Sequence, residues 1–133
     1  MRKIVVTAVL GLVLLAGCAS DATIRTTASR LPGTYYSGDG LGRMVTVALN
    51  SDGTFYSDWQ GCLGVYGEAS GTWTLQGDQI TFKPADEHQI LVGYLRQATT
   101  VHRDGRLGFA RAQDVDQEKI REDLVFFKQP ERR

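Results

Sequence analysis

The feature that most constrains the fold is an alternation of apolar and polar residues, in short segments separated by turns. Residues 44–49, MVTVAL, place Val45, Val47 and Leu49 on one face of an extended strand. The dipeptide Asp52-Gly53 follows, and Asp-Gly readily adopts the positive φ angles of a hairpin turn. The chain is therefore expected to be mainly β. The same pattern predicts further strands at residues 33–36, 54–59, 71–75, 79–83, 106–112 and 124–128, and a longer one, bent at Gly93, at residues 89–103.

The number of strands and the shortness of the turns predict how the sheet is arranged. About eight strands in roughly 100 residues favour an antiparallel meander closed into a small barrel, and an open sandwich is the alternative. Residues 124–128, LVFFK, are apolar on both faces, and barrel closure would cover them. One short helix is expected before this strand, because Asp114 is a good N-cap residue and Gln117 completes a capping box. Residues 85–88 are expected to form a loop.

The glycine-rich stretch within residues 59–73, WQGCLGVYGEASGTW, is expected to be a loop between the strands that hold its two tryptophans. Its glycines lack the lysine and the strand–turn–helix context of phosphate-binding loops, so they indicate loop geometry. Cys62 in this stretch has three interpretations. It is a small buried side chain, a thiol that joins two copies in a disulfide-linked dimer, or a reactive group that contacts a ligand.

The N-terminal segment has the pattern of a secretory signal. Two basic residues precede an apolar run at residues 4–15, which is too short to cross a bilayer as a helix. The run ends in Leu15-Ala16-Gly17-Cys18, which closely resembles the lipobox of bacterial lipoproteins. The resemblance implies cleavage before Cys18, acylation with chains such as palmitate, and stable anchoring to a membrane. An ordinary signal peptide cut near Ala19 is the alternative.

Three regions follow from this interpretation. Residues 1–17 form the lipoprotein signal peptide, residues 18–30 form the lipidated cysteine and a flexible tether, and residues 31–133 form the barrel domain. Ala19 and Ser20 stand where an aspartate would resemble an inner-membrane retention signal. The resemblance therefore implies a location at the outer membrane, facing the periplasm.

Three motifs occur in order within residues 31–82: G-T-Y-Y, V-x-V-x-L-x-x-D-G-T-F and G-T-W-T-L-x-G-D-x-I-T-F. Together they resemble small bacterial envelope lipoproteins with lipocalin-like barrels, such as the N-terminal domain of copper-stress outer-membrane lipoproteins. The chain lacks the Cys-x-x-Cys of that copper-linked group, so copper handling is not implied. The lipoproteins that it resembles are uncharacterised, so the resemblance implies a fold and a location rather than an activity.

The aromatic residues suggest where a ligand would bind. A barrel of about eight strands is just wide enough to be filled by side chains or to hold one small ligand. Such a pocket predicts a non-catalytic binding or envelope-sensing module for a small apolar ligand or envelope component. The alternative is a protein-interaction role, as an inhibitor or accessory subunit of an envelope complex. The residues for the first role, as core or pocket lining, are Tyr35, Phe55, Trp59, Trp73 and Phe82, and those for partner contact are Cys62, Leu63, Val65 and Tyr66.

Charge and motif content argue against other classes of function. Lys and Arg number 15, as do Asp and Glu, so net charge implies no nucleic-acid partner. His88 follows Asp86 and Glu87, but three adjacent residues rarely converge on one ion, so we expect no metal. No nucleophile elbow accompanies His88 or His102. We therefore expect no enzyme activity, no catalytic residues and no cofactor.

Overall fold

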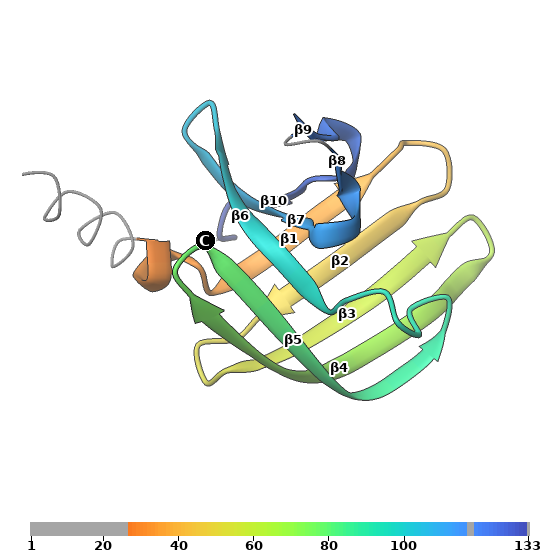
Figure 1. The fold of residues 1–133 in the computed structure, drawn as a ribbon. Coiled ribbons are helices and arrows are strands. Elements are labelled where there is room, and N and C mark those ends of the chain that lie inside the picture. The colour runs from red at the N-terminus through yellow and green to blue at the C-terminus, as the bar shows by residue number, and fades with distance from the viewer. Residues whose placement is uncertain (1–26, 117–118, 133) are drawn as a thin grey trace, which may run out of the picture.

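The protein forms a closed antiparallel β-barrel in the computed structural model, which describes residues 27–116 and 119–132 (Figure 1). The strands follow the order β1-β10-β7-β6-β5-β4-β3-β2 around the barrel, and β2 pairs again with β1. The prediction of a mainly β, eight-stranded antiparallel barrel is confirmed, and the sandwich alternative is wrong. The barrel strands are β1 (Gly33–Gly38), β2 (Met44–Leu49), β3 (Thr54–Gly61), β4 (Gly64–Gln76), β5 (Gln79–Gln89), β6 (Gln97–Arg103), β7 (Arg106–Arg111) and β10 (Phe126–Lys128).

The alternating pattern of β2 places its apolar face inside the barrel. Val45, Val47 and Leu49 are each at most 1% exposed. The following turn has Gly53 at φ 86°, and the Asp52 carboxylate accepts a hydrogen bond from the backbone N–H of Thr54 at 2.9 Å. Local sequence thus determines both this strand and its hairpin.

The glycine-rich stretch is mostly strand, which corrects the predicted loop. Only Cys62 and Leu63 separate β3 from β4, and β4 runs for 13 residues. The loop predicted at residues 85–88 is wrong as well, because β5 continues through it, paired with β4. A Cβ atom at Gly71 would lie 2.2 Å from the backbone oxygen of Lys83. Glycine here permits two long strands to approach closely.

The long bent strand predicted at residues 89–103 is also corrected. Only β6 is extended, and residues 90–96, which we call the strap, form consecutive turns with Gly93 at φ 75°. The strap packs Leu91 and Leu95 into the core, where both are at most 1% exposed. As a result, β6 pairs with β5 only at residues 79–81 of β5.

The short helix predicted from Asp114 is replaced by two single 3₁₀ turns around a small hairpin. These elements are η1 (Ala112–Asp114), β8 (Val115–Asp116), β9 (Lys119–Ile120) and η2 (Glu122–Leu124). Asp114 caps no helix because its carboxylate accepts two hydrogen bonds from the Arg111 guanidinium, at 2.7 and 3.1 Å. The expected capping partner, Gln117, lies outside the described residues.

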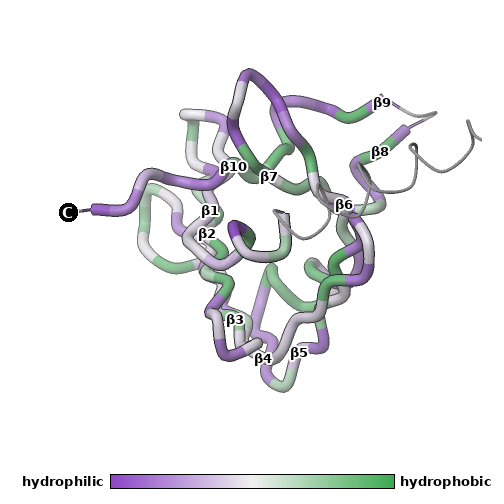
Figure 2. The backbone as a smooth tube through the Cα atoms, turned by 90° about the vertical axis from the view of Figure 1, so that its left-hand side faces the viewer, coloured by the Kyte–Doolittle hydropathy of each residue, from purple (hydrophilic) through white to green (hydrophobic). Residues whose placement is uncertain are grey.

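The two ends of the barrel differ. At one end, the base, the helical turn of residues 27–30 lies across the opening (Figure 2), and Leu31 behind it is completely buried. The Tyr35 hydroxyl donates to the carbonyl oxygen of Leu31, and the Lys128 ammonium donates to that of Arg30. The opposite end, the rim end, carries the β1–β2, β3–β4 and β5–β6 connections (Figure 1).

The predicted signal peptide and Cys18 lie outside the described residues, as do residues 19–26 of the predicted tether. Residues 27–30 belong to the helical turn at the base, and Thr27 is 7% exposed. Any membrane anchor at Cys18 therefore connects to the barrel through its base. The rim end is the end farther from that connection (Figure 1).

Candidate functional site at the rim end of the barrel

Three of the five aromatic residues predicted as core or pocket lining lie in the centre of the barrel. Phe55 meets Phe82 edge to face with the ring centroids 5.1 Å apart, and Tyr35 contacts Phe109 at the same separation. Tyr35, Phe55 and Phe82 are each at most 2% exposed. Burial raises the pKa of the Tyr35 phenol above its ordinary value. These rings contact one another and form the core.

The two tryptophans of the set lie at opposite ends. Trp73 is half-buried at the base, where its indole N–H donates to the carbonyl oxygen of Asn50 at 3.1 Å. Trp59 is half-buried at the rim end and meets Tyr94 of the strap edge to face, with the centroids 5.5 Å apart. The structure therefore divides the predicted set, and only Trp59 belongs to the rim end.

The residues predicted for partner contact lie together on the β3–β4 hairpin. Leu63 at its tip is 90% exposed, Val65 is 51% exposed and Tyr66 is 38% exposed. Cys62 is a free, exposed thiol, so its interpretation as a small buried side chain is wrong. The Tyr66 ring lies directly over Gly61, where a Cβ atom would overlap it. All four side chains are available to a partner.

Three further exposed aliphatic residues from neighbouring connections join them. Leu41 is 87% exposed on the β1–β2 connection, and Ile90 and Val92 are 49% and 63% exposed on the strap. The connections touch one another: the backbone N–H of Ile90 donates to the Tyr66 carbonyl oxygen at 3.3 Å, and a Cβ atom at Gly42 would lie 4.0 Å from the Cys62 sulfur. We call this set the apolar rim; its members are Leu41, Leu63, Val65, Tyr66, Ile90 and Val92.

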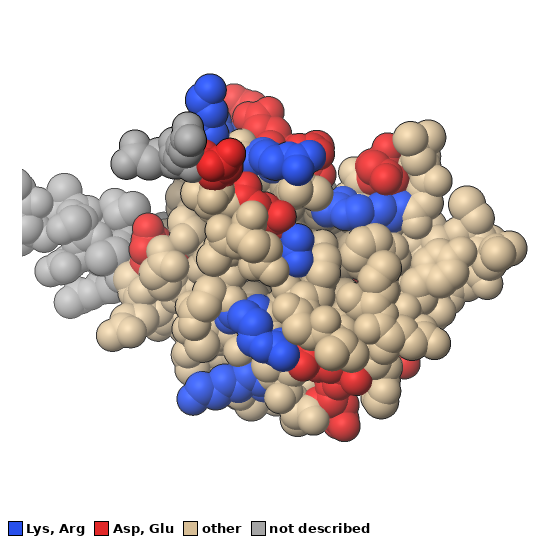
Figure 3. Space-filling view, turned by 45° about the vertical axis from the view of Figure 1, so that its right-hand side comes forward, with Lys and Arg blue, Asp and Glu red and all other residues tan. Residues whose placement is uncertain are grey.

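Sequence reasoning missed the members outside the hairpin, although a signal was present. Leu41 stands between Gly40 and Gly42, and the strap contains Val92-Gly93, so each connection exposes an aliphatic residue beside glycine. Residues 40–42, 59–67 and 89–95 contain no Asp, Glu, Lys or Arg. In Figure 3 the right-hand tip, toward which the β3–β4 hairpin projects in Figure 1, shows no blue or red side chains.

Inside the apolar rim, two arginines and two aromatic rings cross the mouth of the barrel. The Arg43 guanidinium lies 5.9 Å from the centre of the Trp59 ring, and the Arg111 guanidinium lies 3.6 Å from the centre of the Tyr94 ring. Because Trp59 also contacts Tyr94, the four side chains form one continuous arginine–aromatic cluster. Arg111 is further paired with Asp114, and their side chains are only 12% and 9% exposed.

The strap is attached to β5 by one ion pair. Both Glu87 carboxylate oxygens accept hydrogen bonds from the Arg96 guanidinium at 2.7 Å, and one also accepts the backbone N–H of Gly93 at 2.8 Å. The hydrogen bonds from Arg96 are the main reason that the pKa of Glu87 is lowered, and that of Arg96 is raised in return. This pair holds the strap against the rim end.

The acidic and histidine residues near the strap do not converge on one point. Asp86 and His88 lie opposite Ser70 and Glu68 on β4, whereas the intervening Glu87 faces the strap. Among residues 27–116 and 119–132, no group of three or more His, Cys, Asp or Glu side chains is arranged to hold a metal ion. His102, on β6, is exposed.

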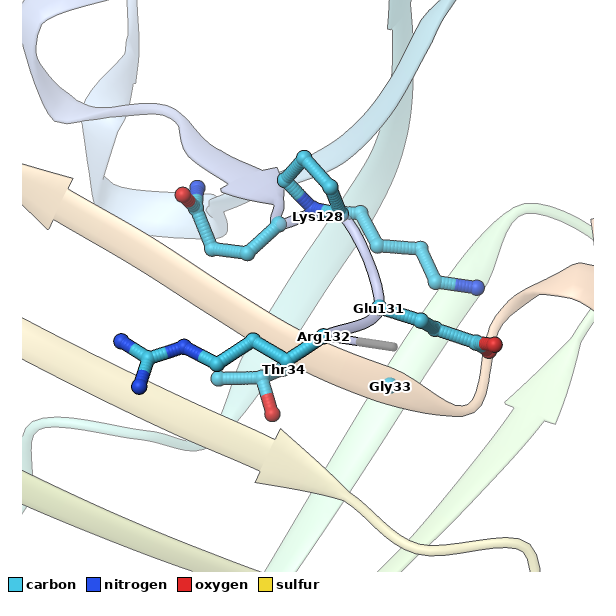
Figure 4. Close-up of a pocket in the computed structure, with 7 residues that line it drawn as sticks. Gly33, Thr34, Lys128, Glu131 and Arg132 are labelled. Carbon is cyan, nitrogen blue, oxygen red and sulfur yellow. The ribbon is translucent and has the colours of Figure 1, made fainter.

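The base carries an open groove of different chemistry. This groove, of 710 Å³, lies between the start of β1 and the C-terminal residues. Its lining includes Thr34, Lys128, Glu131 and Arg132 (Figure 4). Lys128 and Glu131 extend to one side of it and Arg132 extends to the other. The Lys128 ammonium already donates to the carbonyl oxygen of Arg30. The groove presents mixed charges on the chain end rather than a convergent set of groups.

Comparison of the sequence with protein-family models found no match, and comparisons with curated proteins and with solved structures found none either. Within the part of the chain that the structure describes, no helix is long and apolar enough to cross a bilayer.

Proposed function

We propose that the protein is a non-catalytic docking module of the bacterial envelope, anchored by lipid at Cys18 to the outer membrane and facing the periplasm. In this proposal the apolar rim binds an envelope protein that presents an uncharged, apolar surface. One observation carries it: the tips of three neighbouring connections at a single end of a closed barrel expose apolar side chains, and the charged Asp39, Arg43 and Arg96 stand only at the ends of those connections. Contiguous exposed apolar surface of this kind marks interaction sites on soluble domains.

The exposure of the two leucines at the loop tips makes the rim a favourable contact surface. Leu41 and Leu63 are 87% and 90% exposed, although a leucine gains about 1.5–3 kcal/mol when it is fully buried. Glycines beside both residues allow the tips to adjust to a partner. A partner that covers both leucines therefore gains about 3–6 kcal/mol from the two side chains, before the costs of association.

The charge pattern supports a protein partner rather than an anionic membrane surface. Peripheral membrane binding relies on a cluster of exposed Lys and Arg beside the apolar side chains. Beside the apolar rim, Arg43 is half-buried and Arg96 is paired with Glu87. The predicted anchor connects to the barrel through its base, the end opposite the rim end. An uncharged partner surface complements an uncharged rim, because neither side would bury an unpaired charge.

A ligand enclosed at the centre of the barrel has less support. The rings expected to line such a pocket pack on one another there, as with Phe55 on Phe82 and Tyr35 on Phe109. Phe126 also stacks on Phe109 with the centroids 4.9 Å apart. We therefore place binding at the rim end and not in the core.

The test introduces a charge at the apolar rim of the full-length protein in its own envelope. A photoreactive amino acid at position 41 captures the neighbour, which is identified, purified and titrated. We expect Leu63→Asp to weaken the affinity by at least about tenfold, because it removes apolar contact and buries a carboxylate. Gln76→Asp, at the exposed base hairpin, is the matched control and should bind normally. Equal affinity of the Leu63→Asp protein and the wild type would overturn the proposed docking surface.

The anchor is tested separately by mass spectrometry of the mature N-terminus. We expect a chain that begins at Cys18 and carries acyl groups, and a Cys18→Ser variant that is released from the membrane fraction. A mature chain that begins after residue 18 without lipid would contradict the proposed anchor but not the docking surface.

A further inference from the structure

The arginine–aromatic cluster contains one side chain that the docking proposal does not use. Arg43 precedes β2 and has the same inward orientation as Val45, two residues later. Ser37, Val45 and Trp59 are register partners across β1, β2 and β3, so they form one layer at the mouth of the barrel. The Arg43 guanidinium lies over this layer, donating from Nη2 to the Ser37 hydroxyl oxygen at 2.8 Å.

The other terminal nitrogen of Arg43, Nη1, is buried and has no hydrogen-bond acceptor among the described residues. It is the one buried side-chain nitrogen or oxygen in residues 27–116 and 119–132 with this property. Leaving a donor of a charged group unpaired in the interior costs free energy, so native proteins rarely retain one without a reason. A guanidinium edge with free N–H groups is the group that binds carboxylate or phosphate oxygens in a forked geometry.

The charged groups around Arg43 make their hydrogen bonds to other groups. Arg111 is matched by Asp114 in a close ion pair and donates from Nη1 to the Tyr94 carbonyl oxygen. The Asp39 carboxylate, on the loop before Arg43, accepts the backbone N–H groups of Leu41 and Arg43 at 2.8 and 3.0 Å. No ion pair to the Arg43 guanidinium is formed by the described residues. The Asp39 charge thus acts on Arg43 without a direct ion pair, and the Asp114 carboxylate is paired with Arg111.

We propose that Arg43, with Ser37, is the binding site for an anionic oxygen group, a carboxylate or phosphate, carried on an apolar chain. The oxygens accept from Nη1 of Arg43, and the apolar chain lies against Trp59 and the apolar rim. Because Nη1 is covered, binding requires the atoms that cover it to shift. The site concerns a small amphiphile and does not depend on the protein partner proposed above.

The test titrates the protein alone with decanoate, decyl phosphate, decanol and acetate, each below its micelle concentration. Binding is measured by calorimetry and by the fluorescence of Trp59 in a Trp73→Phe background, which removes the tryptophan at the base. We expect one saturable site for decanoate and decyl phosphate. Decanol and acetate should each bind at least about tenfold more weakly, because a charge-assisted hydrogen bond and the apolar contact are both needed.

Variants then locate the site. Arg43→Gln should lose at least about tenfold in decanoate affinity while its weak binding of decanol stays unchanged. Arg103→Gln, an exposed arginine near the base turn, is the matched control and should bind as the wild type does. Arg43→Lys keeps the positive charge but lacks the paired N–H groups of a guanidinium, so it should bind decanoate several-fold more weakly. This variant still tests the site if Arg43→Gln does not fold.

Three results would overturn the proposal: no saturable decanoate binding, decanoate binding by the folded Arg43→Gln protein equal to the wild type, or equal affinity for decanol and decanoate. Equal affinity for acetate and decanoate would overturn the assignment of an apolar chain. These outcomes leave the docking proposal intact, because its test uses Leu63→Asp and a purified protein partner.

Discussion

A single methyl group at Gly71 should show whether the long β4–β5 pairing is correct. The Cβ atom of Gly71→Ala would lie 2.2, 2.7 and 2.8 Å from backbone atoms of Lys83, Pro84 and Ala85. These atoms belong to β5 at the point where its register with β4 shifts. Backbone atoms cannot rotate away as a flexible side chain can, so one strand must move.

The size of the effect follows from these contacts. Forcing an extra methyl group against packed backbone costs about 1–3 kcal/mol, and a contact of 2.2 Å with a strand oxygen favours the upper part of that range. Reduced freedom of the unfolded chain offsets about 0.4–1 kcal/mol. We therefore expect the free energy of unfolding to fall by about 2 kcal/mol, which corresponds to a Tm decrease of roughly 8–16 °C for a domain of this size.

The assay is urea unfolding followed by tryptophan fluorescence, with Gly77→Ala as the comparison. Gly77 has φ 63° and open space around its Cβ position, so its substitution incurs only the left-handed backbone cost of about 1 kcal/mol. The φ angle of Gly71 lies outside the left-handed region, so Gly71→Ala measures only the effect of the close contact with β5. An unfolding free energy for Gly71→Ala within about 0.5 kcal/mol of the wild type would refute the close approach of the strands.

Three further predictions concern the charged and phenolic groups. Because Glu87 has a lowered pKa in the folded protein, its carboxylate stabilises the fold above the unfolded-state value of about 4.3 and loses that contribution as pH falls through the folded value. Urea midpoints should thus decline less below about pH 4 for Glu87→Gln than for the wild type; parallel declines would contradict this. Asp114→Asn should lower the free energy of unfolding by about 3 kcal/mol, because it leaves the buried positive charge of Arg111 without a carboxylate partner. The double variant Arg111→Met/Asp114→Leu removes both charges and should recover part of this loss in the same urea assay. The hydrogen bond to Glu68 raises the pKa of Tyr56 to about 12, and ultraviolet titration of Glu68→Ala, which removes the acceptor, should move it toward about 10, whereas an unchanged midpoint would exclude the hydrogen bond as the cause.

Much of the barrel was predictable because its determinants are local. Alternation in β2 placed Val45, Val47 and Leu49 inside, and the Asp52-Gly53 turn set the hairpin that follows. A period of two residues and a turn that needs positive φ are properties of a few consecutive residues. The contact residues predicted on the β3–β4 hairpin are exposed for the same reason, since the tip lies at a glycine-rich turn.

The errors arose where a residue's role depends on contacts that the folded chain makes and the local pattern does not show. Gly67 indicates a loop when considered alone, but in the barrel it lies in β4 against the backbone of His88. Asp114 has the pattern of a helix cap, yet Arg111 takes its carboxylate when η1 turns the chain back. Competition between a local preference and a stronger tertiary contact is not visible in the sequence.

By itself, the sequence determined the eight-stranded antiparallel barrel and most of its inward faces, because these depend on local alternation and turn chemistry. Only the tertiary structure decided how the rim end is composed. Closure of the barrel brought Leu41 and Val92 to the same end as Leu63, and it placed Arg43 over Trp59 with one nitrogen unpaired. These residues belong to separate connections of the chain. Strand order and register bring them together, and no single segment of the sequence contains that information.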